Sequence, residues 1–381
     1  MRIFVLGFLL ALSIVCAGLC NAQTAQPAKA QKQPAQHELE RQKANENVLI
    51  LLGGPTGGPY IQLAQDLATA FNDSDNLRVM PMIGEGAVKN VRDILLLRGV
   101  DLGISTVQVL NSLKTSGEYG PNLDRRIAYI APLSVDMFHV LARPEYKSLQ
   151  DLKGKKVSFQ LKGSATAAFG PKVLKALGIE VTEVHVFVND AIQLMRNGEL
   201  DAAVCICPVP VPAFPPVKSE WGFKFLEVPY IPALENDYLP AGLTSAQYPN
   251  LVIGDSKVRT IATSTVLIAY NWSPGTERYR RIEKFVEVFF SNFDKLRQPP
   301  RHPAWRDVNI SASIPGWQRF GAAQRWLDRQ AAEEAAKAQP RGIDPAHARA
   351  QAAKAAPHDR AEQERLFNEF IEWTRRQPKR Q

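Results

Sequence analysis

Residues 48–71 read VLILLGGPTGGPYIQLAQDLATAF and decide the fold. The first five residues form an uninterrupted apolar run, which is typical of a parallel strand buried on both faces. Glycines end this run. From Tyr60 to Phe71 apolar residues recur at helical spacing, and Asn72-Asp73 follows as a stop signal. A buried strand, a glycine-rich turn and an amphipathic helix predict the start of a right-handed strand–helix–strand arrangement.

The same alternation continues along the chain. We expect strands at 78–83, 101–105, 156–160, 183–187 and 200–206, and helices at 88–98, 165–177 and 190–196. A proline-dense stretch at 208–216 predicts an extended loop. A short strand at 223–228, a β-rich segment at 260–270 and an amphipathic helix at 276–296 follow. This pattern predicts an α/β protein with parallel strands.

The N-terminus predicts export. Arg2 precedes an apolar stretch from Ile3 to Leu19, and small residues stand before Gln23, so residues 1–22 are interpreted as a cleaved secretory signal. A single membrane anchor is the alternative, but the run is short for a span and no basic cluster follows it. Residues 23–46 contain almost no large apolar residues and are predicted to be a disordered leader.

Composition excludes several classes of protein. The chain has 381 residues, of which 45% are hydrophobic and 22% charged, as in a globular protein of about two domains. The only long apolar run is N-terminal, which excludes a multi-span membrane protein. Net charge is +8, but much of the excess lies in the C-terminal tail, so we expect no nucleic-acid partner.

Three glycine-containing turns predict a binding site. They lie at 53–60, 84–90 and 162–166, each between a predicted strand and a predicted helix. Backbone N–H groups at such turns, together with the positive end of the helix dipole, can bind an anion. None has the spacing of a phosphate loop or a dinucleotide fingerprint. Spread over two sheets, the turns predict a cleft between two α/β lobes that binds a small anion or zwitterion.

Catalysis and metal binding have little support. The six histidines are scattered, and no hydrolase or zinc-protease motif is present. His139 and His185 fall within strand patterns and are interpreted as structural. Once the signal is removed, Cys205 and Cys207 remain. A disulfide between them would close a strained ring, because they are only two residues apart, so they are interpreted as buried small apolar residues. A lone C-x-C without neighbouring ligands is also a weak metal signal. We expect no enzyme activity, no cofactor and no metal.

Several basic residues could pair with a carboxylate ligand, although a solvated surface charge is the simpler interpretation for each: Arg125, Arg126, Arg143 and Lys162. In the tail, helices are predicted at 316–329 and 359–376, with a flexible segment at 331–357. An apolar stripe on the last helix either packs on the protein itself or binds a partner: Leu366, Phe367, Phe370, Ile371 and Trp373.

A set of segments in a fixed order resembles the TAXI family of solute receptors for TRAP transporters, over about residues 48–327. The segments are Thr56-Gly57-Gly58-x-Tyr60, residues 86–90 (GAVKN), residues 101–104 (DLGI), residues 151–157 (DLKGKKV), residues 163–166 (GSAT) and residues 197–202 (NGELDA). The sequence departs from the family pattern at Ala87 and Lys89, where a serine and a glutamate are usual.

The resemblance implies a periplasmic-binding-protein-like fold with two α/β lobes, a hinge and an interlobe cleft. The protein would be a monomer in the periplasm that delivers a small carboxylate or amino acid, glutamate-like or another dicarboxylate, to TRAP membrane permease subunits. The residues expected to bind the ligand are Thr56, Gly57, Gly58, Tyr60, Gly86, Ala87, Val88, Asn90, Thr106, Ser164, Ala165 and Thr166.

We expect a discontinuous first lobe, residues 47–139 with 257–329, and a second lobe at 140–256, followed by a basic Ala/Arg-rich tail at 330–381. The hydroxyls of Ser164 and Thr166 would donate to the ligand carboxylate. An alternative function is that of a periplasmic ligand sensor, which signals to a partner through the C-terminal tail.

Overall fold

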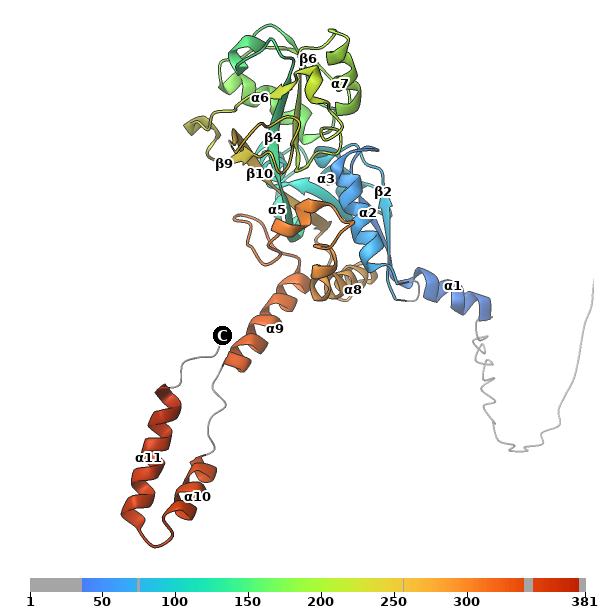
Figure 1. Ribbon diagram of the computed structural model, residues 1–381. Coiled ribbons are helices and arrows are strands. Elements are labelled where there is room, and N and C mark those ends of the chain that lie inside the picture. The colour runs from blue at the N-terminus through green and yellow to red at the C-terminus, as the bar shows by residue number, and fades with distance from the viewer. Residues whose placement is uncertain (1–35, 74–75, 256, 339–344, 377–381) are drawn as a thin grey trace, which may run out of the picture. The chain divides into compact units, whose positions relative to one another are not determined.

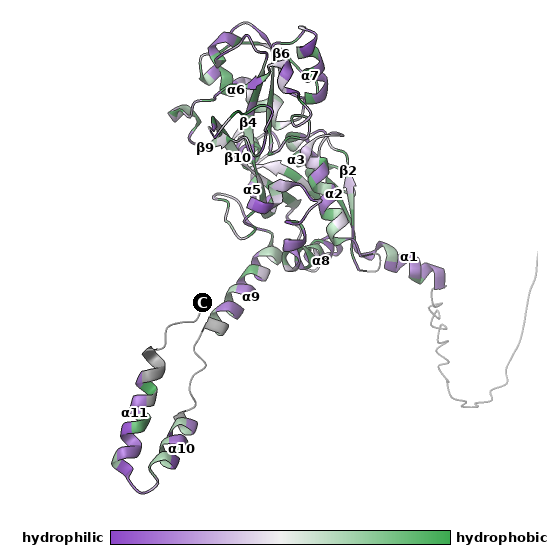
Figure 2. Cartoon of the chain, in the orientation of Figure 1, coloured by the Kyte–Doolittle hydropathy of each residue, from purple (hydrophilic) through white to green (hydrophobic). Residues whose placement is uncertain are grey.

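A computed structural model of the chain describes residues 36–73, 76–255, 257–338 and 345–376. The chain divides into two compact units, residues 1–42 and 43–381. Helix α1 (Gln36–Glu46) begins in the first unit and has no buried residues, and Figure 2 shows it as mainly hydrophilic. The prediction of disorder was wrong over this helix, whose Glu, Gln, Lys, Arg and Ala residues favour helix formation. The predicted signal and residues 23–35 lie outside the described residues.

The N-terminal strand–helix alternation is confirmed. The elements are β1 (Val48–Leu52), α2 (Pro59–Phe71), β2 (Arg78–Met82), α3 (Ala87–Leu96) and β3 (Leu102–Thr106). β1 pairs in parallel with both β2 and β3. We call the part of the molecule built around these three strands lobe 1. The segment between β3 and the next strand forms α4 (Val107–Ser116) and α5 (Leu123–Arg126).

A second set of parallel strands forms lobe 2. Its elements are β5 (Lys156–Ser158), α6 (Ala165–Ala176), β6 (Thr182–Val184), α7 (Val188–Arg196) and β7 (Ala202–Pro208). β5 lies between β6 and β7 and is parallel to both. The short strands β8 (Lys224–Phe225) and β9 (Leu239–Leu243) extend the sheet beside β4 and β10.

One continuous sheet joins both lobes, so the expectation of two separate sheets was wrong. Two long antiparallel strands, β4 (Ile127–Ala142) and β10 (Val258–Tyr270), produce this continuity. β10 pairs with β3 of lobe 1, while the second half of β4 pairs with β7 of lobe 2. The resulting strand order is β2-β1-β3-β10-β4-β7-β5-β6. Figure 1 shows these two strands running between the lobes.

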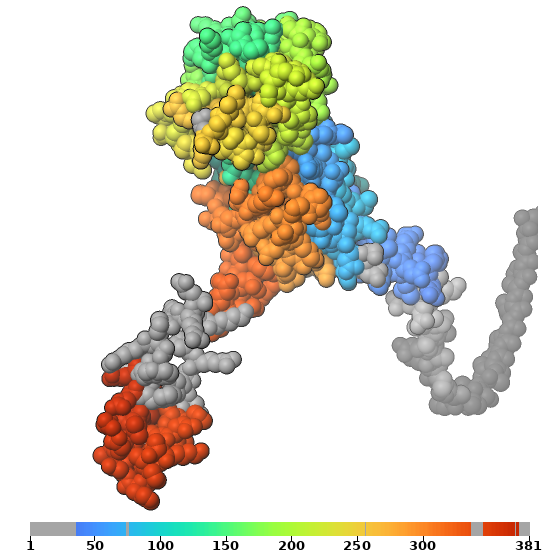
Figure 3. Space-filling view, viewed as in Figure 1, coloured from blue at the N-terminus to red at the C-terminus, as the bar shows by residue number. Residues whose placement is uncertain are grey.

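Lobe 1 also contains residues from late in the chain. Helix α8 (Glu277–Ser291) contacts α2 and β1, and in Figure 3 the orange segment lies directly against the blue one. Aromatic contacts join them, such as the edge-to-face pair of Phe71 and Phe289 with ring centroids 5.9 Å apart. A single hydrophobic core extends from β1 through β4 and β10 to β7, and a second cluster lies within lobe 2 around Tyr248.

The C-terminal region is more helical than predicted. Helix α9 spans Gly321–Ala338, α10 spans Pro345–Ala355 and α11 spans Arg360–Arg376. The prediction of a flexible segment at 331–357 was therefore wrong over most of its length. Alanine is the strongest helix former, and its small side chain lets α10 approach α11 closely, which buries Ala348 and Ala352. Among the described residues, no helix is both long and apolar enough to span a membrane.

Candidate ligand-binding site

A small cavity lies where the two lobes meet. Its volume is about 50 Å³ in this arrangement, well below the roughly 300–1,000 Å³ of pockets that hold drug-sized ligands. The turn after β1, the start of α2 and Gly86, the N-cap of α3, supply its lobe 1 wall. The turn after β5, the start of α6 and the end of β7 supply its lobe 2 wall. All three of the glycine-containing turns therefore come together at one place.

Six of the twelve residues expected to bind a ligand line this cavity: Gly58, Tyr60, Gly86, Ser164, Ala165 and Thr166. The other six do not. Thr56 and Gly57 are exposed in the first turn, and Ala87 is buried in the core. Val88 is half-buried on α3 outside the wall.

Asn90 and Thr106 have structural roles instead. The Asn90 amide donates to the carbonyl oxygens of Gly53 and Ile104, at 2.7 and 2.8 Å, which ties α3 to the first turn and to β3. The Thr106 hydroxyl accepts a hydrogen bond from the Val109 amide and caps α4. Both side chains are fully buried.

The second turn contacts the opposite lobe directly. The backbone N–H groups of Val88 and Lys89, at the start of α3, donate to the carbonyl oxygen of Gly163 at 3.2 and 3.4 Å. Gly86 has a φ of 125°, a conformation that only glycine adopts readily. A Cβ atom on Gly86 would lie 2.9 Å from the Cα of Ser164. The N-terminus of α3 therefore binds a carbonyl of lobe 2, and the lobes are closed here.

The hydroxyls of the third turn have partners within the protein. Ser164 is the N-cap of α6: its hydroxyl accepts from the Ala167 amide at 3.1 Å and donates to the Leu161 carbonyl at 2.8 Å. The Thr166 hydroxyl accepts from the Ile206 amide at 2.9 Å. The Ser164 hydroxyl has one hydrogen and it is already used, so this group cannot also donate to a ligand. The Thr166 hydroxyl only accepts, so its hydrogen and the backbone N–H groups at the start of α6 are the remaining sources of donors in this turn.

Replacing Ser164 with alanine is expected to destabilise the protein by about 1 kcal/mol, because α6 loses its N-cap. Chemical denaturation monitored by circular dichroism would measure this loss. Ser164→Asp restores a capping oxygen and should recover most of the stability. If Ser164→Ala and Ser164→Asp were equally stable, the capping role would be excluded.

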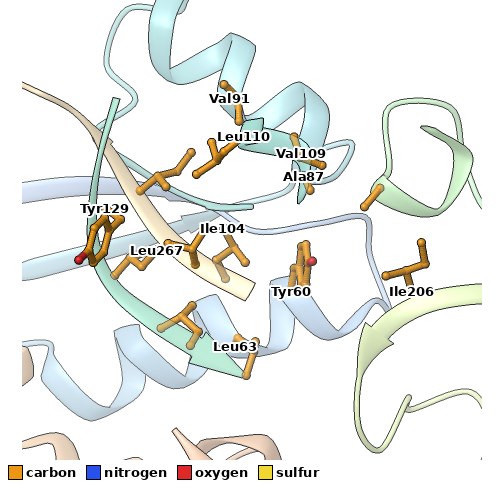
Figure 4. Close-up of a cluster of buried hydrophobic side chains, with 14 of the residues drawn as sticks. Tyr60, Leu63, Ala87, Val91, Ile104, Val109, Leu110, Tyr129, Ile206 and Leu267 are labelled. Atoms are coloured by element: carbon orange, nitrogen blue, oxygen red, sulfur yellow. The ribbon is translucent and has the colours of Figure 1, made fainter. Parts of the chain in front are cut away.

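Tyr60 holds a buried carboxylate behind the cavity. Its hydroxyl donates to Asp136 at 2.5 Å, and the Thr265 hydroxyl donates to the other carboxylate oxygen. Asp136 belongs to β4 and is fully buried. Burial raises the pKa of Asp136 to about 7, although the two hydrogen bonds oppose this rise. In Figure 4 the side chain of Tyr60 lies across from that of Ile206, which belongs to β7. The Tyr60 ring therefore forms part of the wall, while its hydroxyl is already engaged.

Sequence reasoning missed several wall residues. Leu161, Phe187 and Ile206 supply apolar surface, and Gln160 supplies an amide. Phe187 precedes α7 and lies against the first turn, where a Cβ on Gly58 would be 3.7 Å from its ring. The only signal for these residues was their proximity to strand ends, where ligands bind in α/β sheets. Nothing in the local sequence indicates which of them face the other lobe.

Cys205 and Cys207 form a disulfide, the bond that ring strain had made the less favoured of the two interpretations. Alternate residues of a strand point to the same face, and the Cα atoms are 5.5 Å apart, within the usual range for disulfides. Both residues are buried as expected, and Cys207 lines the cavity.

The other candidate polar residues do not reach the cavity. His139 is buried, its Nδ1 is 3.2 Å from the Cys205 carbonyl oxygen and its Nε2 is 2.9 Å from the Tyr248 hydroxyl, in agreement with a structural role. Burial lowers the pKa of His139 to about 4. Arg143 pairs with Glu145, and Lys162 is exposed. Among the described residues, no Lys, Arg or His side chain lines the cavity.

Two α/β lobes, two connecting strands and a cavity between strand-to-helix turns define a periplasmic-binding-protein-like fold. Residues 51–316 match the NMT1-like family. The match covers more than half of the chain, and the protein belongs to this family. No curated protein matches the sequence.

Several solved structures align at low identity. One is described as a periplasmic transporter, with 13% identity, a TM-score of 0.45 and coverage of 77% of this chain and 97% of its own. Another is the amino acid ABC transporter substrate-binding protein AbpA from Streptococcus pneumoniae, bound to L-arginine. It has 14% identity, a TM-score of 0.39 and coverage of 70% and 98%, respectively.

Proposed function

We propose that the protein is a periplasmic solute receptor of the TAXI type, which captures a small organic anion or amino acid and delivers it to a TRAP-type permease. The observation that carries this proposal is the cavity between the lobes, whose walls come from both lobes and include the starts of α2 and α6. A ligand there would contact both lobes at once. The predicted secretory signal at residues 1–22 supports a periplasmic location.

Helix geometry supports an anionic group on the ligand. Gly58 and Ser164 are the N-caps of α2 and α6, and both line the cavity. The first N–H groups of a helix lack partners within the helix, and the helix dipole places partial positive charge there. α2 has 13 residues and α6 has 12, so each helix is long enough to have this polarity. Pro59 at the start of α2 has no N–H, so a carboxylate between the helices would accept backbone hydrogen bonds from the residues that follow it and from the start of α6, without a basic side chain.

A thermal-shift screen tests the function. The mature chain from Gln23 onward, checked by native mass spectrometry to be free of copurified ligand, would be screened against amino acids, keto acids and other small carboxylates. A ligand at 100 times its dissociation constant stabilises the folded state by about 2.7 kcal/mol. We expect a rise in Tm of several degrees for one or a few of these compounds. A folded, ligand-free protein that shifted with none of them would count against a receptor for small acids.

A matched pair of variants locates the binding site. Leu161 is 36% exposed at the cavity wall, and Leu96 is 62% exposed on α3, away from the cavity. Leu161→Trp should narrow the cavity and abolish the ligand-induced shift, whereas Leu96→Trp should retain it. A shift that survived Leu161→Trp would place the ligand elsewhere.

A further inference from the structure

Gln160 has free hydrogen-bonding groups in the cavity wall. The other polar side chains of the wall, those of Tyr60, Ser164 and Thr166, each have a partner within the protein. The side-chain amide of Gln160 forms no hydrogen bond with any residue in the described part of the chain, although Gln160 is only 6% exposed. Because Gln160 lines the cavity, its free donor and acceptor are available to a bound molecule.

The backbone of Gln160 is held in an unusual conformation. Its φ is 62°, a left-handed value that few residues other than glycine adopt. Neighbouring bonds fix it there: the Gln160 carbonyl lies 3.3 Å from the Nδ1 of His185, and the Phe159 amide donates to the Val184 carbonyl at 2.9 Å. Such conformations persist where surrounding structure imposes them and are common at ligand sites. This fixed backbone conformation positions Gln160 in the cavity wall in the absence of a ligand.

The rest of the wall limits the charge that a ligand can carry. Leu161, Phe187, Ile206 and the disulfide at Cys207 are apolar. The nearest basic side chain of α3, Lys89, extends toward Glu85 at 3.9 Å. The two helix N-termini can stabilise one anionic group. A second carboxylate would lose its hydration without gaining a cationic partner, which is strongly unfavourable.

We propose that the cavity selects a small monocarboxylate with an apolar body and one uncharged hydrogen-bonding group, and that Gln160 is the specificity-determining residue that binds this group. The proposal rests on the proposed function, and it replaces the dicarboxylate expected from the family resemblance. The carboxylate lies at the starts of α2 and α6. The apolar body lies against Phe187 and Ile206, and a carbonyl, hydroxyl or amide group of the ligand pairs with the Gln160 amide.

Four acids with the same five-carbon chain test the proposal by isothermal titration calorimetry. Pentanoate has no second polar group, 4-oxopentanoate has a carbonyl, 5-amino-5-oxopentanoate has an amide, and glutarate has a second carboxylate. We expect the carbonyl or the amide acid to bind at least about tenfold more tightly than either pentanoate or glutarate. Tightest binding of glutarate would overturn this proposal and leave the receptor function intact. Failure of all four to bind at millimolar concentration would overturn this proposal, and the thermal-shift screen would then decide separately whether the receptor function stands.

Variants at Gln160 assign the selectivity to this residue. Gln160→Leu has similar size and no β-branch, so it should tolerate the same backbone, and it should reduce the preference for the polar acid over pentanoate to about one. Gln160→Asn keeps an amide, tolerates the left-handed conformation and should retain part of the preference. Lys162→Met is the control for a nearby basic residue outside the wall and should bind like the wild type. Unchanged selectivity in a folded Gln160→Leu variant would exclude the proposed role.

Discussion

Replacing Gly86 with alanine is expected to hold the lobes apart and to weaken ligand binding by roughly 5- to 150-fold. The new Cβ would lie 2.9 Å from the backbone of Ser164, and the φ of 125° is almost restricted to glycine. Together these effects correspond to about 1–3 kcal/mol against the closed arrangement. Calorimetry with the tightest-binding acid would measure affinity, and small-angle X-ray scattering without ligand would detect the opening.

Gly178→Ala is the matched control for this change. Gly178 also has a positive φ, 76°, but a Cβ there would have nothing within 4 Å. This control should lose some stability through backbone strain and keep its ligand affinity. If Gly86→Ala bound ligand as tightly as Gly178→Ala did, contact between the second turn and lobe 2 would not contribute to closure.

Replacing Asp136 with alanine is expected to destabilise the protein by at least about 3 kcal/mol. The buried hydroxyls of Tyr60 and Thr265 both donate to this carboxylate, and each buried donor left without an acceptor costs about 1–3 kcal/mol. Urea unfolding of the ligand-free protein would measure the loss. A change below about 0.5 kcal/mol, typical of surface positions, would contradict the structural role of this group.

The pH dependence gives a second readout for Asp136. Burial raises its pKa to about 7, above the value near 4 of an unfolded aspartate. The folded state therefore binds the proton more tightly, and the stability from this group is present below about pH 4 and lost as pH rises through about 7. His139, with its lowered pKa of about 4, acts in the opposite direction. The difference in stability between wild type and Asp136→Asn isolates Asp136 and should fall over this pH range.

Local sequence pattern predicted most of the strand–helix units. Hydrophobic periodicity and the Gly, Pro and Asn residues that end an element are properties of short stretches of sequence. The apolar run at Val48–Leu52 and the helical spacing of α2 and α6 have the expected forms. The joining of both lobes into one sheet depends on how far β4 and β10 extend and which strands they pair with. Such pairing connects residues 60 or more positions apart, and short-range periodicity carries no information about it.

In the candidate site, too, contacts between distant segments could not be predicted from local sequence. The three turns were predicted as binding elements, and all three border the cavity. The partners that occupy their polar groups come from distant segments: Gly163 for the amides of α3, Ile206 for Thr166 and Asp136 for Tyr60. Gln160 carried no signal, because glutamine is not a residue type associated with left-handed backbone.

The continuous sheet has a consequence for how the molecule unfolds. β4 and β10 supply hydrogen bonds and core side chains to both lobes, and one hydrophobic core reaches from β1 to β7. Neither lobe can lose these strands without exposing apolar surface of the other. The two lobes are therefore expected to unfold together as one cooperative unit. A destabilising substitution in either lobe should then lower the free energy of unfolding of both.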